Sequence, residues 1–145
     1  SKACHRTGLD QDALGSSSDG NAFVVANACA SLLEISNQTG KNYFKLNKGQ
    51  NLHKILTAVN ESNEWGQIYI LEALSIHDPN DILEAEQICE RVAPRLSHNN
   101  PAVILSAVKV LIKNIDFIKD KELKKTLLKK LAAPLISLLS SEAEL

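Results

Sequence analysis

Aromatic residues are scarce in this sequence, and neither sign of charge is in clear excess. Phenylalanine, tyrosine and tryptophan together make up 4% of the 145 positions, and the 16 basic residues nearly balance the 17 acidic ones. A formal net charge of −1 lacks the basic excess of proteins that bind nucleic acid. We therefore expect no nucleic-acid partner, and any basic interaction must be local.

Cysteines and long apolar runs are scarce as well. Cys4, Cys29 and Cys89 are odd in number and show no C-x-x-C spacing, which argues against a disulfide framework and against a zinc site. No stretch approaches the roughly 18 consecutive apolar residues of a membrane-spanning helix, and the polar first residues lack the apolar core of a secretion signal. These features predict a soluble intracellular protein. Cys89 and Cys29 are both expected to act as small buried apolar groups.

Sequence signatures of catalysis are missing. The six glycines are scattered, without a phosphate-binding loop or nucleophile elbow, and the four histidines do not combine with acidic or sulfur residues at a known metal-ligand spacing. His77, Asp78 and Asp81 cluster with Asn80 and Pro79, a composition typical of turns. We predict neither an enzyme nor a bound cofactor or metal; a small helical enzyme remains the alternative from another class.

Helical spacing of apolar residues begins near residue 21 and continues to the end of the sequence. Steps of three and four place apolar residues on one face in each run, and no segment alternates like a strand. The stripe in the first run comprises Val24, Val25, Ala28, Leu32 and Ile35. Residues 1–18 lack this pattern, so we divide the chain into a poorly ordered leader, 1–18, and a helical part, 19–145.

Local signals predict where the helices begin and end. Asn63, Asp81, Asn100 and Asp120 each precede an apolar run as N-cap residues do, with Pro101 at the first helical position after Asn100. Asn47 with Gln50 resembles a capping box, and Gly40 is placed to end the first helix. Ser141 with Glu144 has the spacing of a further capping box, which predicts a new helix there.

Segments of the sequence repeat at about 40 residues. Ala28, Ile70 and Ala107 occupy matching positions at intervals of 42 and 37 residues, and Pro94 and Pro134 match across 40 residues. Such a period is typical of HEAT and armadillo repeats. We predict an all-α, right-handed α-solenoid, with a proline kink recurring in one helix of the repeat.

Three long segments make the resemblance to one family specific. Residues 60–74 (NESNEWGQIYILEAL), 85–111 (AEQICERVAPRLSHNNPAVILSAVKVL) and 126–145 (TLLKKLAAPLISLLSSEAEL) are similar to consecutive stretches of the β-adaptin trunk, and residues 21–36 match more weakly. The polar leader and residues 77–87 depart from the family's pattern.

The resemblance implies a structural segment of a clathrin-adaptor subunit in vesicle-mediated protein transport and cargo sorting. It implies as partners a second large chain, a medium chain and a small chain. Clathrin would be reached only through regions absent from this sequence, and membranes through the assembled complex. The implied location is cytoplasmic, peripheral on Golgi, endosomal or plasma-membrane coated vesicles. The alternative is an α-solenoid scaffold of another coat or transport-receptor family.

Two groups of residues are candidate contact sites. Lysines recur in residues 119–130 at helical spacing and suit anionic lipid headgroups or an acidic partner, although charge runs are more often solvated helix faces. These lysines are Lys121, Lys124, Lys125, Lys129 and Lys130. Trp65, the single tryptophan, either fills the join between repeats or anchors a partner at the surface.

The leucine-rich run of residues 123–139 predicts a further association. If the helix that would follow it is missing, part of its apolar face is uncovered, and exposed apolar patches favour self-association. We therefore expect this chain to pair through its last helix.

Overall fold

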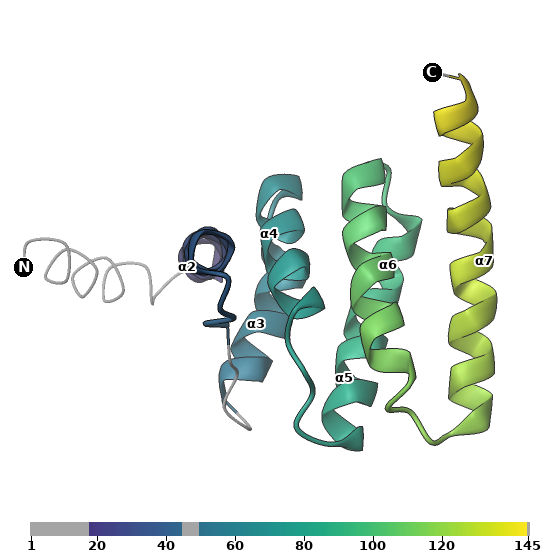
Figure 1. The fold of residues 1–145 in the computed structure, drawn as a ribbon, viewed down its shortest axis with the longest axis horizontal. Coiled ribbons are helices and arrows are strands. Elements are labelled where there is room, and N and C mark those ends of the chain that lie inside the picture. Colours follow the sequence, from purple (N-terminus) through teal and green to yellow (C-terminus); the bar gives the residue numbers. More distant parts are fainter. Residues whose placement is uncertain (1–17, 45–49, 145) are drawn as a thin grey trace, which may run out of the picture. The chain divides into compact units, whose positions relative to one another are not determined.

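The computed structural model describes residues 18–44 and 50–144, and these residues form helices without any strand (Figure 1). The helices are α2 (Ser18–Thr39), α3 (Gln50–Glu61), α4 (Glu64–Ser75), α5 (Ile82–Val92), α6 (Pro101–Ile115) and α7 (Lys121–Glu144), and a 3-10 turn, η1 (Ala93–Ser97), follows α5. The all-α prediction is confirmed. Of the predicted leader only Ser18 is described, as the first residue of α2.

The predicted helix starts are correct because each rests on a local cap. The side chain of Asp81 accepts from the Glu84 amide at 2.8 Å, and that of Asn100 accepts from the Ala102 amide at 2.9 Å. Asn63 accepts from the Gly66 amide at 2.9 Å and Asp120 from the Glu122 amide at 3.0 Å. Each bond satisfies an amide that lacks a partner within the helix. The Asn47 capping box lies outside the described residues.

Gly40 ends α2 as predicted. Its φ of 71° is in the left-handed region, and its amide donates to the Ser36 carbonyl at 2.9 Å. A residue with a Cβ is strained in this conformation, so glycine is the favoured residue at this position.

The described residues divide into two compact units, one ending at Ile70 and one beginning at Leu71. In the first unit α2 buries Ala22, Ala26 and Cys29, whereas Ala28 is exposed. The predicted stripe of Val24, Val25 and Ala28 is therefore not the buried face, and Ala28 does not match the buried Ile70 and Ala107. Small side chains face inward because α4 comes close: a Cβ on Gly66 would lie 3.2 Å from that of Ala26.

The second unit has a core of fully buried aliphatic side chains. Val92 of α5 and Val103, Val110 and Leu111 of α6 are completely shielded, and α7 adds Leu127 and Leu131. The loops joining α5, α6 and α7 are short, so successive helices fold back as hairpins (Figure 1). Helical hairpins of this kind are the building units of an α-solenoid.

The two prolines of the predicted repeat differ in their effect. Before Pro94 the α-helix ends at Val92 and the chain continues as η1, whereas α7 remains α-helical through Pro134. The prediction that both prolines affect their helices alike is therefore wrong, because α5 stops before Pro94 whereas α7 extends for ten residues beyond Pro134.

The predicted new helix at Ser141 is also wrong, because α7 runs unbroken to Glu144. A capping box requires a non-helical N-cap residue, and the preceding leucine-rich turns keep the backbone helical.

Candidate interaction surfaces

The predicted lysine cluster lies along the first half of α7. Lys121, Lys125 and Lys129 follow one another at four-residue steps and are exposed, as is Lys130, while Lys124 is half-buried. None of the ion pairs within the described part of the chain involves them. Like charges at i and i+4 repel by a few tenths of a kcal/mol, so an unpaired row of this kind costs the free helix some stability. We call Lys121, Lys125 and Lys129 the lysine stripe.

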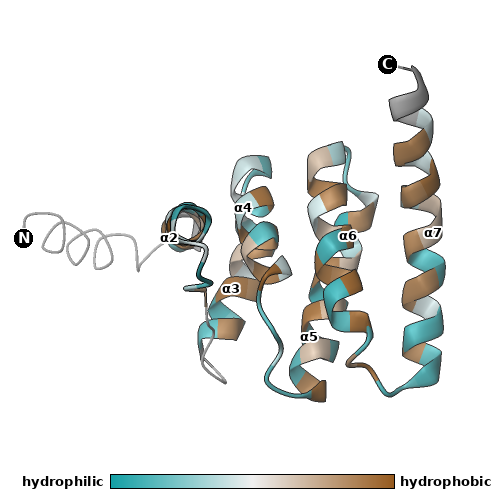
Figure 2. Cartoon of the chain, viewed as in Figure 1, coloured by the Kyte–Doolittle hydropathy of each residue, from teal (hydrophilic) through white to brown (hydrophobic). Residues whose placement is uncertain are grey.

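From Leu128 onward α7 also exposes apolar side chains, on a face that overlaps that of the lysine stripe. Leu128, Leu135 and Leu139 are exposed together with Ile136, Leu139 by 68% and Ile136 by 64%. Figure 2 shows the change along α7, from mainly hydrophilic first turns to apolar later ones. One helix therefore presents a basic segment followed by an apolar one.

Trp65 is on the surface, not inside a helix join. Its side chain is 43% exposed and packs edge to face on Tyr69, one turn later, with ring centroids 4.9 Å apart. It borders a pocket of about 390 Å³ between α2, the turn before α4, and α4 itself. Trp65 therefore does not fill the contact between α2 and α4 at Gly66, and its role as a partner anchor stays a prediction.

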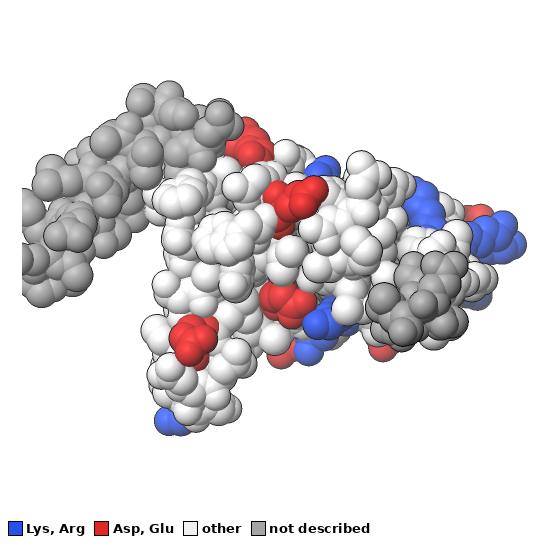
Figure 3. All heavy atoms as spheres, turned by 90° about the horizontal axis from the view of Figure 1, so that it is seen from above, with Lys and Arg blue, Asp and Glu red and all other residues white. Residues whose placement is uncertain are grey.

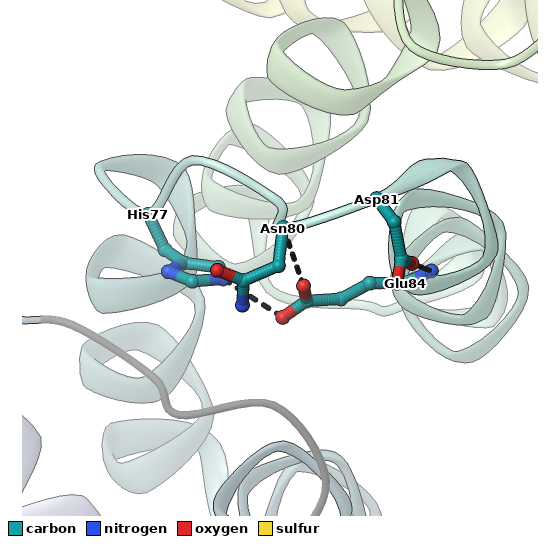
Figure 4. A network of polar contacts seen from close by, with 4 residues as sticks. All are labelled: His77, Asn80, Asp81 and Glu84. Carbon is teal, nitrogen blue, oxygen red and sulfur yellow. Dashed lines mark hydrogen bonds and ion pairs between the residues drawn. The ribbon is translucent and has the colours of Figure 1, made fainter.

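A buried polar network joins α5 to the preceding turn, and sequence reasoning missed it (Figure 4). His77 and Glu84 are 4% and 5% exposed, and Nε2 of His77 lies 3.0 Å from Oε1 of Glu84. The other Glu84 oxygen accepts from the Asn80 amide. The predicted turn at His77, Asp78 and Asp81 is correct. Its polar contacts converge on Glu84, which lies in the first turn of α5. The spacing of Asp81 and Glu84 indicated the cap, but no pattern in the sequence indicated the contact with His77.

Ion pairs join α6 to α4 and to the turn that follows α4. Glu72 of α4 accepts from the Ser106 hydroxyl at 2.8 Å and lies 3.1 Å from the Lys109 ammonium. Lys113 lies 2.8 Å from Asp78, and its hydrogen bond and charge lower the pKa of that carboxyl. These contacts position α6 and pair charges within the fold, so they do not indicate a ligand-binding site.

Both described cysteines are buried. Desolvation raises the pKa of the Cys29 and Cys89 thiols to about 12. Thiols in this state are poor nucleophiles and metal ligands. The expected packing role fits their positions in the two cores.

Charged side chains of both signs are scattered among uncharged ones on the face drawn in Figure 3. The described residues contain no group of three or more histidine, cysteine or acidic side chains placed to hold a metal ion. In the same part of the chain, no helix combines the length and apolar character needed to cross a membrane.

Comparison with known proteins identifies β subunits of AP-1 and AP-2 complexes as relatives. The chain is 51% identical over 127 residues to "AP-1 complex subunit beta" of Dictyostelium discoideum and 55% identical over 130 residues to "AP-1 complex subunit beta-1" of Homo sapiens, each match covering 88% of the chain. It is 37% identical over 128 residues, 87% of the chain, to "AP-2 complex subunit beta" of Schizosaccharomyces pombe. The chain spans only 13%, 14% and 18% of these relatives.

A family model described as non-SMC mitotic condensation complex subunit 1 matches residues 2–113. The matched region runs from before α2 into α6, and with the adaptor relatives it agrees with the α-solenoid fold class predicted from the repeats. The chain belongs to this Cnd1 family of α-helical sequences and, by its likeness to the AP-1 β subunits, is a stretch of a β-adaptin.

Proposed function

We propose that this chain is a structural and interaction segment of the β subunit of a clathrin-adaptor complex, acting in vesicle-mediated intracellular protein transport and cargo sorting. The observation that carries the proposal is the 51–55% identity to AP-1 β subunits across 88% of the chain. Identity of this extent covers the helices of both compact units, so it reflects a shared fold and not a short motif. Because the chain spans 13–14% of these relatives, the proposed role is that of one segment.

The proposed mechanism is geometric and non-enzymatic. Helical repeats stack their apolar faces on one another and leave an extended surface for partners. The partners we propose are a second large chain, a medium chain and a small chain. Clathrin is proposed to bind through regions outside this chain, and the assembled complex is proposed to lie on the cytoplasmic side of coated Golgi, endosomal or plasma membranes.

A scaffold of another complex is the second candidate. It is favoured by the match to the condensation-complex family model, which shows that this helical pattern also occurs outside adaptors.

Affinity capture from cell extract tests the proposal. A tagged full-length parent protein should recover the second large, medium and small adaptor chains in comparable amounts. Val110→Asp, which places a charge in a fully buried position of α6, should abolish their recovery, whereas Lys119→Asp in an exposed loop should not. Recovery of a different coat or of condensation subunits would contradict the adaptor assignment.

A further inference from the structure

Two aromatic side chains lie exposed beside one pocket of the first compact unit. Phe23 of α2 is 59% exposed and Trp65 of α4 is 43% exposed, and both line the pocket of about 390 Å³. Trp65 is held by its edge-to-face contact with Tyr69, at an interplanar angle of 63°. Its indole ring is therefore already oriented in the free protein, so binding does not have to fix the side chain at a cost in conformational entropy.

Glu61 supplies a carboxylate to the same pocket, in an unfavourable place for the fold. It is the last residue of α3, where the partial negative charge of the helix dipole disfavours an acid, and the last turn of α3 contains no basic residue. No ion pair within the described residues compensates Glu61. Residues that violate a local rule without an internal compensation are expected at functional sites.

The neighbouring N-terminal end of α4 has capping groups and an acid of its own. The first amides of α4 are engaged by Asn63, whose side chain accepts from Gly66 and whose carbonyl accepts from Gln67, both at 2.9 Å. Glu64 in the first turn of α4 adds a further negative charge near its positive end. The Ser62 hydroxyl, also in the pocket wall, is buried without a hydrogen-bond partner.

We propose that Phe23, Glu61 and Trp65 form a binding site for the guanidinium of an arginine side chain on a partner peptide segment. A guanidinium is planar and weakly hydrated, so it stacks on aromatic faces while it donates two parallel hydrogen bonds to a carboxylate. A lysine ammonium has no planar face and holds its hydration more strongly, which makes it the poorer occupant. The site is independent of the proposed adaptor role, because it rests on the pocket alone.

Intrinsic fluorescence provides a direct test because Trp65 is the only tryptophan of the chain. The full chain is titrated with the peptide acetyl-Gly-Arg-Gly-amide, and then with the same peptide carrying citrulline or lysine. Citrulline keeps the planar shape and removes the charge. We expect saturable changes in emission with the arginine peptide, and an affinity about fivefold or more above that of either other peptide.

Variants test the residues named. Phe23→Ser and Glu61→Gln alter exposed side chains, and each should weaken arginine binding by about fivefold. Glu34→Gln is the matched control, since it makes the same charge change on α2 outside the pocket, and it should leave binding unchanged. Circular dichroism shows that each variant is folded. Equal affinity for arginine and citrulline, equal affinity for arginine and lysine, or unchanged binding by Glu61→Gln would overturn the proposal.

Discussion

At the scale of single residues, Glu84 joins a turn to a helix. Its two oxygens contact His77 and the Asn80 amide, and both His77 and Glu84 are buried. Removing the Glu84 carboxylate takes one polar contact from the buried His77 ring and one from the Asn80 amide, and the loss of a buried polar contact costs about 1–3 kcal/mol. We expect Glu84→Ala to lower the free energy of unfolding in urea by that amount.

The matched control for this prediction is Glu90→Ala, an exposed position on the same helix. Substitutions at exposed sites without such contacts usually change stability by about 0.5 kcal/mol or less. A loss in Glu84→Ala no larger than that in Glu90→Ala would show that the buried network contributes nothing.

The buried cysteines give a prediction about pH. Because burial raises the pKa of Cys29 and Cys89 from 9.0 to about 12, both remain protonated in the folded chain well above pH 9. The thiol form favours folding below the unfolded pKa, and this contribution is lost as pH rises from about 9 towards 12. At pH 8.5, alkylation of these two thiols should be slow in buffer and fast in urea. Peptide mass spectrometry identifies the labelled cysteine, and rapid native labelling of Cys89 would contradict the prediction.

At the scale of helices, much of the fold could be predicted from the sequence because helix starts are local. Asn63, Asp81, Asn100 and Asp120 cap neighbouring amides, so a few consecutive residues suffice to find them. The buried face of α2 was not predictable in this way. It consists of small residues, Ala22, Ala26 and Cys29, which hydrophobicity does not distinguish, and it depends on the approach of α4 at Gly66.

The candidate sites were predictable only in part. The lysine stripe follows from helical spacing, and the structure places its three members exposed on α7. The roles of Glu61 and Phe23 beside Trp65 depend on three segments coming together, which no local pattern reveals. For the same reason the contact of His77 with Glu84, seven residues apart across a turn, was missed.

Pro134 offers a test of helix energetics. A proline inside a helix removes one backbone hydrogen bond and costs about 3 kcal/mol relative to alanine. We expect Pro134→Ala to raise the stability of the chain by about 1–3 kcal/mol in urea unfolding. Pro94→Ala should change it much less, because the α-helix has already ended at Val92 and continues only as the short η1. An equal gain from both substitutions would contradict this reasoning.

The lysine stripe gives a second test at the same scale. If it contacts anionic membranes, each lysine contributes about 1 kcal/mol, so Lys121→Gln, Lys125→Gln and Lys129→Gln together should weaken binding to phosphoinositide vesicles by roughly a hundredfold. Binding should also fall with added salt. The control with equal charge change is Lys41→Gln, Lys54→Gln and Arg91→Gln, all exposed outside α7. Binding is measured by vesicle flotation. An equal loss of binding in both triple variants would show that the lysine stripe is an ordinary solvated helix face.

At the scale of the whole molecule, the exposed apolar residues of α7 predict self-association. Leu128, Ala132, Leu135 and Leu139 follow one another at steps of four, three and four, the spacing of a seam between two packed helices. A second copy of the chain offers an identical seam, and antiparallel pairing would keep the two lysine stripes apart. Burial of such a stripe contributes about 25 cal/mol per Å² of apolar surface.

We therefore expect a dimer whose population rises with concentration in analytical ultracentrifugation. Leu135→Lys with Leu139→Lys should yield a monomer at every concentration, because each exposed apolar side chain is replaced by a charge that would have to be desolvated in the seam. Ile112→Lys is the control, the same kind of change at one exposed apolar position on α6, and it should leave the dimer intact. Since the replaced residues are exposed, all variants should unfold at the same urea concentration when measured as dilute monomers. A parent chain that is monomeric at every concentration, or an Ile112→Lys variant that dissociates as readily as the double variant, would show that the α7 seam does not pair two copies.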